Sequence, residues 1–326
     1  MKLRVLLGTL ALLAAATVAA FLVSPWPSVW VIRAVFDAGA RRASDALAAR
    51  VPAHVRTTAD LHYDPDDPDA VLDIHRGDGA TAAGPTVVWF HGGGFISGRR
   101  SDVSNYLKIL AGRGFVVVNV DYTIAPEAIY PTPIRQANRA LAYLAANASR
   151  LGLNGGKFVL AGDSAGAQIA AQTAAMLTHP AYARALGIRP GVPAASVAGT
   201  LLHCGAYDVT AMGKGGGVLG WFVRSTTWAY SGHRDWRDAP GFADMSIPPH
   251  VTAAFPPTFI SAGNADPLGP QSVVLADTLK ALGVAVTPLF FPADYQPPLG
   301  HEYQFDLATE AGTQALDASS AWLREL

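Results

Sequence analysis

The sequence predicts an α/β fold, a mostly parallel sheet covered by helices on both faces, and two observations predict it. Six short apolar runs lack the polar alternation of a half-exposed strand, and helical patterns separate them, as in a parallel sheet buried on both sides. The chain has 326 residues, half of them apolar, which is enough for one large domain with a sizeable core. The six runs are 86–90, 115–120, 157–161, 197–203, 258–262 and 284–291.

The N-terminus carries an uncharged apolar run behind two basic residues. Residues 5–23 make 19 positions, about 28 Å as a helix, close to the hydrocarbon thickness of a bilayer. A retained anchor and a signal peptide cleaved after residues 18–20 both fit this segment. Because the apolar character continues to Trp26 and Trp30, which are typical of a membrane interface, we expect residues 1–27 to be an anchor. The rest of the chain is then expected outside the cytoplasm.

A helix and a hairpin are predicted next. Residues 28–51 place apolar side chains at helical spacing, with arginines on other positions, which predicts an amphipathic helix with one buried face. Residues 54–63 and 70–76 have the character of two strands joined by a Pro/Asp turn at 64–68. With the six apolar runs, this hairpin predicts an eight-stranded sheet.

Two later segments depart from the strand pattern. After Tyr130, Thr132 as N-cap and Pro133 as the first helical residue predict a helix that ends at Gly152. Residues 209–255 contain no clear strand, but they contain three consecutive glycines and seven large aromatic side chains. Long connections of this kind are usually lids or binding loops. An insertion over the site is therefore expected, and a plain packing excursion is the alternative.

Composition argues against several classes of protein. The net charge of -1 leaves no basic surplus for binding nucleic acid. The single cysteine, Cys204, cannot form an internal disulfide, and its apolar neighbours predict a buried thiol. Since no Cys/His cluster has metal-ligand spacing, we expect neither a metal nor an organic cofactor.

A nucleophile is predicted at Ser164. The motif Gly162-Asp163-Ser164-Ala165-Gly166 follows the apolar run at 157–161 and precedes a helical pattern at 167–177. A strand, a sharp turn and a helix are the context of an exposed serine nucleophile. The glycines are needed because only hydrogen at the flanking positions lets such a turn close. The competing interpretation is a small-residue turn without chemistry.

A glycine run follows the first of the six apolar runs. In His91-Gly92-Gly93-Gly94-Phe95, consecutive glycines let backbone N–H groups point into a cavity. We expect Gly93, Gly94 and Ala165 to supply an oxyanion hole. A phosphate-binding loop is the alternative, but the G-x-G-x-x-G order and a following Lys-Ser/Thr pair are missing. His91 itself is interpreted as structural.

His301 is the candidate general base and Asp266 the candidate acid that orients it. His301 lies late in the chain, before the closing helical segment at 309–326. The chain order Ser, Asp, His requires a histidine in this late part of the sequence. Asp266 follows the apolar run at 258–262 and precedes His301 by 35 residues. Asp294 is the alternative acid, although prolines on either side of it indicate a turn.

Five motifs in order resemble the hormone-sensitive-lipase family of bacterial esterases, the GDSAG branch, within the α/β-hydrolase superfamily. The resemblance covers residue 51 to the C-terminus. It implies an α/β-hydrolase domain at 28–326 with a helical cap from about 28–52 and 209–255. The motifs are His91-Gly92-Gly93-Gly94, Asp121-Tyr122 with Ala125-Pro126-Glu127, Gly162-Asp163-Ser164-Ala165-Gly166, Asp266-Pro267-Leu268 and His301.

The chain departs from that family pattern at three places. Thr123 stands where members usually have Arg, and Gly269-Pro270 stands where an acidic residue is common. Glu302 follows the candidate base, where glycine is frequent. These departures bear on local packing and specificity.

Together these residues predict a serine carboxylesterase or lipase that cleaves short- to medium-chain acyl esters through an acyl-enzyme intermediate. The expected partner is a small-molecule ester, and the oligomeric state is not predicted. One alternative is an amidase or deacetylase with the same triad. The other is a non-catalytic receptor of the same fold, against which the retention of all three candidate residues argues.

Overall fold

The computed structural model describes residues 2–80, 83–212 and 215–326. Met1 of the predicted anchor and residues 213–214 of the predicted insertion lie outside them. Eight strands form one sheet in the order β1-β2-β4-β3-β5-β6-β7-β8, which confirms the predicted eight-stranded sheet. The strands are β1 (Arg56–His62), β2 (Val71–Arg76), β3 (Thr86–Phe90), β4 (Val116–Val120), β5 (Phe158–Asp163), β6 (Val197–His203), β7 (Thr258–Ala262) and β8 (Val286–Phe290).

The sheet is mostly parallel, as predicted. β1 and β2 form the antiparallel opening hairpin, and β2 is also antiparallel to β4, whereas every later pair is parallel. The inner strands β3, β4, β5 and β7 are buried along their whole length. β8 is shorter than the predicted 284–291 and partly exposed, because it is the edge strand and has a partner on one side only.

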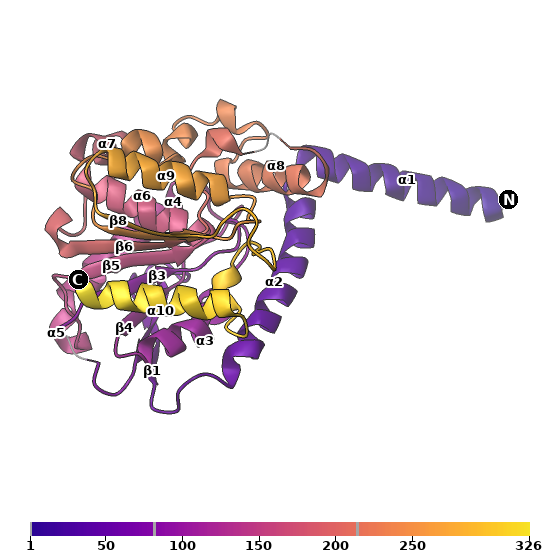
Figure 1. Ribbon diagram of the computed structural model, residues 1–326. Helices are drawn as coiled ribbons and strands as arrows, with labels where there is room; N and C mark the ends of the chain where they lie inside the picture. The colour runs from indigo at the N-terminus through magenta and orange to yellow at the C-terminus, as the bar shows by residue number, and fades with distance from the viewer. Residues whose placement is uncertain (1, 81–82, 213–214) are drawn as a thin grey trace.

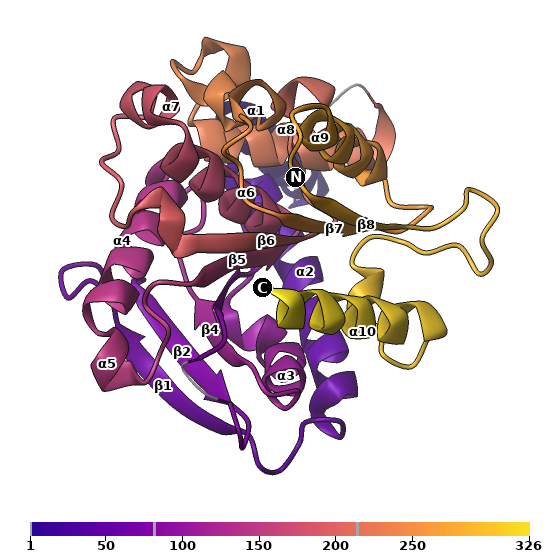
Figure 2. The same cartoon turned by 60° about the vertical axis from the view of Figure 1, so that its left-hand side comes forward.

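Helices cover both faces of the sheet, and each face has its own core. Successive strand residues point to opposite faces, so Val88 and Phe90 of β3 pack on one side and Val87 and Trp89 on the other. Figure 2 shows α4, α6 and α9 above the sheet and α3 and α10 below it. These helices are α3 (Arg100–Ala111), α4 (Thr132–Ala146), α6 (Ala165–Thr178), α9 (Gly269–Ala281) and α10 (Glu310–Glu325).

The helix predicted from Thr132 to Gly152 is two helices. α4 begins at Thr132, so Pro131 is the N-cap, and its carbonyl accepts from the amide of Ile134. It ends at Ala146, and Asn147 leaves the helical conformation with φ -107° and ψ 10° while its backbone amide and its side chain both donate to the Tyr143 carbonyl. The short α5 (Ala148–Leu151) follows, and Gly152 ends it in the left-handed conformation.

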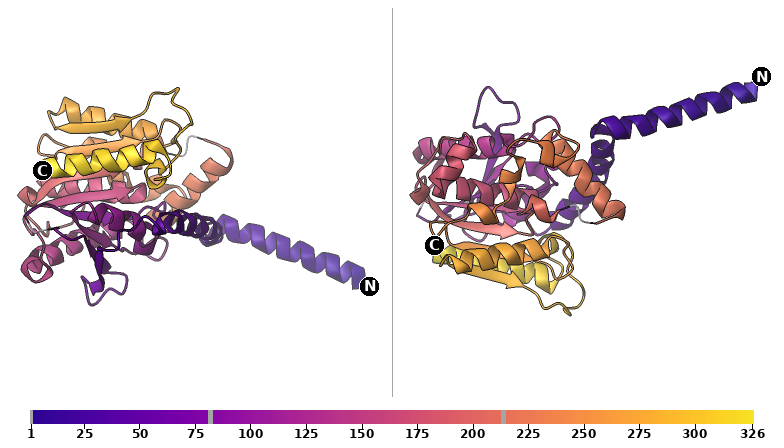
Figure 3. Two further views of the ribbon diagram at one scale, coloured as in Figure 1. Left: turned by 60° about the horizontal axis from the view of Figure 1, so that its bottom comes forward. Right: turned by 90° about the horizontal axis from the view of Figure 1, so that it is seen from above.

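The N-terminal helix projects away from the body (Figures 1 and 3). α1 (Lys2–Val23) has no buried residue, and among the described residues it is the one helix long and apolar enough to span a membrane. A signal sequence passes the same test of length and hydropathy. α2 (Trp26–Ala48) follows almost at once. It begins earlier than the predicted 28–51, because Pro27 fits its first turn.

The predicted insertion at 209–255 contains α8 (Gly217–Ser231) and, in its described part, no strand. α8 packs on α2: the Trp221 Nε1–H group donates to Ser28 Oγ at 3.2 Å, and the rings of Phe222 and Phe36 lie 5.3 Å apart. The remaining helical pieces are short: α7 (Pro180–Ala185) and the 3₁₀ turns η1 (Ala194–Ser196), η2 (Val209–Ala211), η3 (Trp236–Asp238), η4 (Phe242–Met245), η5 (Pro248–His250) and η6 (Tyr303–Phe305).

Candidate active site

Ser164 lies in a strained turn between β5 and α6. Its backbone has φ +52° and ψ -118°, a conformation that non-glycine residues rarely adopt. The flanking glycines leave no room for a side chain, since a Cβ on Gly166 would lie 2.0 Å from the carbonyl oxygen of Phe90 and one on Gly162 would lie 2.5 Å from Gly166. The turn therefore has the geometry that the motif predicted.

The structure brings the three predicted catalytic residues together. His301 Nε2 lies 2.9 Å from Ser164 Oγ, and His301 Nδ1 lies 3.0 Å from Asp266 Oδ1. The Asp266 side chain is fully buried, and its Oδ1 also accepts from the amide of Leu268 at 2.8 Å. All three come from the carboxyl-end edge of the sheet, after β5, β7 and β8, where open α/β sheets bind their ligands. In this arrangement the serine hydroxyl donates to the imidazole and the imidazole donates to the carboxylate.

Two residues considered for other roles lie outside this series. Asp294 is exposed in the loop before His301. An orienting acid would contact His301 Nδ1, but that nitrogen faces Asp266 and not Asp294. His91 is buried, stacks on Tyr122 with ring centres 4.3 Å apart, and lies 2.7 Å from the Gly92 carbonyl oxygen through Nδ1. Burial lowers the pKa of His91, which agrees with a structural role.

The glycine loop presents free backbone N–H groups next to Ser164. Gly93 and Gly94 have φ values of +114° and +61°, and a Cβ on Gly93 would lie 2.1 Å from the Ser97 carbonyl oxygen. Within the described chain, no acceptor takes a hydrogen bond from the amides of Gly93, Gly94 or Ala165. The Gly92 amide differs, because it donates to a carboxyl group at 2.9 Å and so fixes the loop.

That carboxyl group belongs to Asp163, and a second one lies beside it. Asp163 accepts from Trp89 Nε1 at 2.8 Å and from the Gly92 amide, and it is buried. Glu302 adopts φ +60°, which turns its carboxylate toward the same glycine and places Oε1 3.8 Å from His301 Nε2. Burial and the charge of Glu302 raise the pKa of Asp163 well above its usual range.

Sequence reasoning did not assign Asp163 and Glu302 to the site. One signal was available for each: Asp163 precedes the nucleophile, and Glu302 replaces a glycine that is frequent in the family. Neither signal predicts that the two carboxyl groups lie beside each other in the fold.

Cys204 is buried and forms no disulfide, as predicted, and it also lies close to Asp266 and His301. Burial raises the pKa of this thiol. Burial alone would lower the pKa of His301, yet its contacts with Cys204, Asp266 and Glu302 raise it above the ordinary histidine value.

The donor atoms of Cys204, Asp266 and His301 lie within 4.8 Å of one another. A divalent metal ion bound there would take as ligands the His301 imidazole and the Asp266 carboxylate, which hydrogen-bond to each other in this structure.

A cavity of about 910 Å³ opens above Ser164. Its walls are mostly apolar and include α2 and the first part of the predicted insertion, together with the glycine loop and α3. The later part, η3 to η5, lies outside the wall, and in η4 the Met245 carbonyl accepts from Gln168 of α6 at 2.8 Å. Among the described residues, the wall from α2 and the insertion includes Val31, Val35, Phe36, Leu47, Met212, Val218, Leu219, Trp221 and Phe222.

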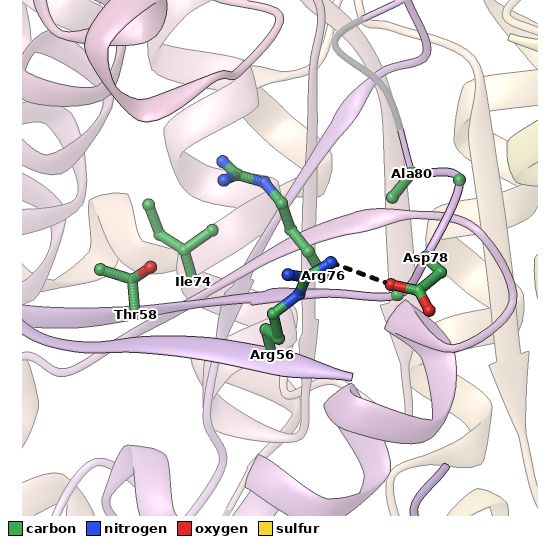
Figure 4. A pocket seen from close by; sticks show the side chains of 8 residues that line it. Arg56, Thr58, Ile74, Arg76, Asp78 and Ala80 are labelled. Atoms are coloured by element: carbon green, nitrogen blue, oxygen red, sulfur yellow. Dashed lines mark hydrogen bonds and ion pairs between the residues drawn. The ribbon is translucent and has the colours of Figure 1, made fainter. Parts of the chain in front are cut away.

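A second hollow, of about 400 Å³, lies on the β1–β2 hairpin. Figure 4 shows it lined by Arg56, Arg76 and Asp78, with Arg56 paired to Asp78 at 3.0 Å. None of the predicted catalytic residues reaches it.

The comparisons with known proteins agree with this fold. A family model of the alpha/beta hydrolase fold matches residues 87–295, so the chain belongs to the α/β-hydrolases, in the group that resembles hormone-sensitive lipase. An acetyl esterase from Salmonella paratyphi B is 32% identical over 204 residues, which cover 60% of this chain and 59% of that protein. The carboxylesterase NlhH of Mycobacterium tuberculosis is 29% identical over 245 residues, which cover 74% of this chain and 73% of that protein.

Solved structures share the architecture. Esterase B of Lactobacillus rhamnosis, inhibited by a tributyrin phosphonate, superposes with a TM-score of 0.77 at 22% identity, covering 92% of this chain and 96% of that one. An esterase of Pyrobaculum calidifontis has a TM-score of 0.71 at 25% identity, covering 91% and 92%. This chain spans about 59% of the length of the acetyl esterases that it matches. The narrower GDSAG branch stays a prediction from the motif.

Proposed function

We propose that this protein is a serine carboxylesterase that hydrolyses short- to medium-chain acyl esters. The observation that carries the proposal is the hydrogen-bonded series from Ser164 through His301 to Asp266 beneath an apolar cavity. The names of the relatives, acetyl esterase and carboxylesterase, support ester cleavage.

The mechanism follows from the roles that these side chains can take. Ser164 Oγ attacks the ester carbonyl carbon while His301 Nε2 removes its proton, and Asp266 keeps Nδ1 protonated and the ring in place. The free amides of Gly93, Gly94 and Ala165 bind the oxyanion. His301 then gives its proton to the leaving alcohol. Water, deprotonated by the same nitrogen, attacks the acyl-enzyme and releases the carboxylic acid.

The cavity walls support a limit on acyl length. The apolar side chains of α2 and α8 favour acyl groups by about 0.8 kcal/mol for each buried CH₂, until the enclosed space is filled. We therefore expect kcat/KM to peak at acyl chains of roughly C4 to C8. Hydrolysis of an ester series from acetyl to palmitoyl tests this directly. A monotonic rise through C16 would show an open site and overturn the capped cavity.

Covalent labelling separates the esterase from its alternatives. An organophosphonate should modify the wild-type chain at Ser164 and leave Ser164→Ala unlabelled, and a receptor without catalysis would stay unmodified. An amidase or deacetylase uses the same groups, so the ratio of ester to amide hydrolysis by the purified protein distinguishes those activities. A ratio that favours amides would replace the carboxylesterase proposal.

The chemistry of α1 supports a membrane location. We propose that residues 1–27 anchor the protein in a membrane, with the catalytic domain outside the cytoplasm. The protein should then sediment with membranes, require detergent for release, and begin at or near Met1. A soluble exported form that starts close to Phe21 would establish a cleaved signal peptide instead.

A further inference from the structure

Exposed apolar side chains gather where α2 and α8 meet. Among the described residues outside α1, ten large hydrophobic side chains are exposed, and six of them lie on these two helices. Val35 is 62% exposed and Val218 is 79% exposed. Single exposed hydrophobic residues are ordinary, but a cluster of them marks an interaction surface. We call this cluster the apolar rim, and its members are Trp30, Val31, Val35, Phe36, Val218 and Leu219.

The α2 part of the rim presents no free charge. Arg33 is the one charged residue between positions 26 and 36, and its guanidinium turns inward. Its nitrogens donate to the Glu127 carboxylate at 2.6 and 2.7 Å and to the Ile96 carbonyl at 2.6 Å. The next exposed basic side chains, Arg41 and Arg42, come more than one turn after the rim. The first turns of α2 therefore offer an apolar surface that is followed by positive charge.

The rim continues directly from the proposed anchor. Only Ser24 and Pro25 separate α1 from α2. The rim residues of α2 therefore lie within about 20 Å of the end of α1, at 1.5 Å per residue. Figure 1 shows α2 running down from the inner end of α1, with α8 beside that end. The paired rings of Trp26 and Trp30, 5.8 Å apart, lie at this junction, and tryptophans favour the boundary between lipid and water.

The rim is also the mouth of the active-site cavity. Every rim residue except Trp30 lines the cavity above Ser164. A surface that touched the rim would consequently touch the opening through which substrate enters.

We propose that the apolar rim rests on the bilayer surface beside the anchor, so that esters dissolved in the lipid enter the cavity without crossing water. The substrate class is a membrane-dissolved ester with a short to medium acyl group and a lipid-soluble alcohol part. Arg41 and Arg42 then face the lipid headgroups, where positive charge binds anionic lipids. This inference rests on the proposed ester hydrolysis and on the proposed anchor.

Contact with the bilayer is tested without any activity measurement. The one native cysteine, Cys204, is buried, so Val35→Cys and Val218→Cys each accept a polarity-sensitive dye on the full chain in phosphatidylcholine vesicles. The matched control is Val274→Cys on α9, whose valine is 53% exposed. We expect blue-shifted emission and quenching by brominated lipid at the rim, and a water-like spectrum at position 274. Water-like spectra at all three positions would overturn the proposal.

Delivery of substrate is tested with two butyryl esters of one dye, one water-soluble and one carrying a hexadecyl chain in the dye. The ratio of lipid-borne to soluble turnover should fall at least tenfold in Trp30→Glu and stay unchanged in Val274→Glu. An equal ratio in both variants would refute entry from the lipid. Failure of the wild type to cleave either ester would instead refute the proposed ester hydrolysis, and the dye spectra would still report whether the rim meets the membrane.

Discussion

Replacing Glu302 by glutamine should move the acid limb of the pH profile to lower pH. The Glu302 carboxylate lies 3.8 Å from His301 Nε2. At that distance two unit charges interact by about 1 kcal/mol in water and about 4 kcal/mol at an effective dielectric constant of 20. Both side chains are about one-third exposed, so screening favours the lower value. A coupling of about 1 kcal/mol corresponds to roughly 0.8 pH unit.

The direction of the shift follows from the form of His301 that reacts. Only the neutral imidazole accepts the serine proton, so activity appears as pH rises through the pKa of His301. The contacts of His301 raise that pKa above the ordinary histidine value, and Glu302→Gln removes one of the charges that raise it. The acid limb of kcat/KM should therefore move down by about 0.8 unit.

The matched control is Asp294→Asn, which removes an exposed carboxylate from the same loop. It should leave the acid limb in place, because Asp294 does not face the imidazole. The kcat/KM of a neutral soluble ester, measured from pH 4 to 9 for the three proteins, checks both expectations. An acid limb within 0.2 unit of wild type in Glu302→Gln, or an equal shift in Asp294→Asn, would refute the reasoning.

Four further substitutions test the candidate site. Ser164→Ala and His301→Ala should each lower kcat by about 10⁴-fold or more. The double variant should have the same kcat as either single variant, because the two groups act as a unit, and single-turnover assays measure all three rates. Asp266→Asn should lower kcat by roughly 10⁴-fold with the fold retained, since the imidazole loses its orienting acceptor. Gly166→Ala should lower the free energy of unfolding by more than about 3 kcal/mol, because its Cβ would meet the Phe90 carbonyl oxygen, and thermal denaturation reports the loss.

Much of the fold was predictable because the burial of a strand determines the pattern of apolar residues in its sequence. The inner strands are covered on both faces, so they read as continuous apolar runs, and β3 and β7 have the predicted bounds. The strained turn at Ser164 was predictable for a similar reason, since close backbone approach permits only glycine at positions 162 and 166. Local steric demands of this kind need no knowledge of distant residues.

The parts that were missed depend on contacts between distant segments. Glu302 faces the imidazole only because its backbone adopts φ +60°, and that conformation belongs to the loop as it packs on Gly92 and Asp163. The interruption at Asn147 is a local exception, where the Asn147 side chain bonds back to the Tyr143 carbonyl of its own helix. The wall of the cavity includes only the first part of the 209–255 segment, because the later turns pack beside α6.

The contact between Ser28 and Trp221 joins residues 193 positions apart, and this separation has a consequence for biosynthesis. α2 leaves the ribosome early, but the helix that completes its packing is made much later. Until then, the apolar face of α2, which includes the buried Val29 and Ile32, is exposed to water or packs against lipid. Closing so long a loop is slow and entropically costly. A nascent chain held at the membrane by α1 would keep that face out of water until α8 arrives.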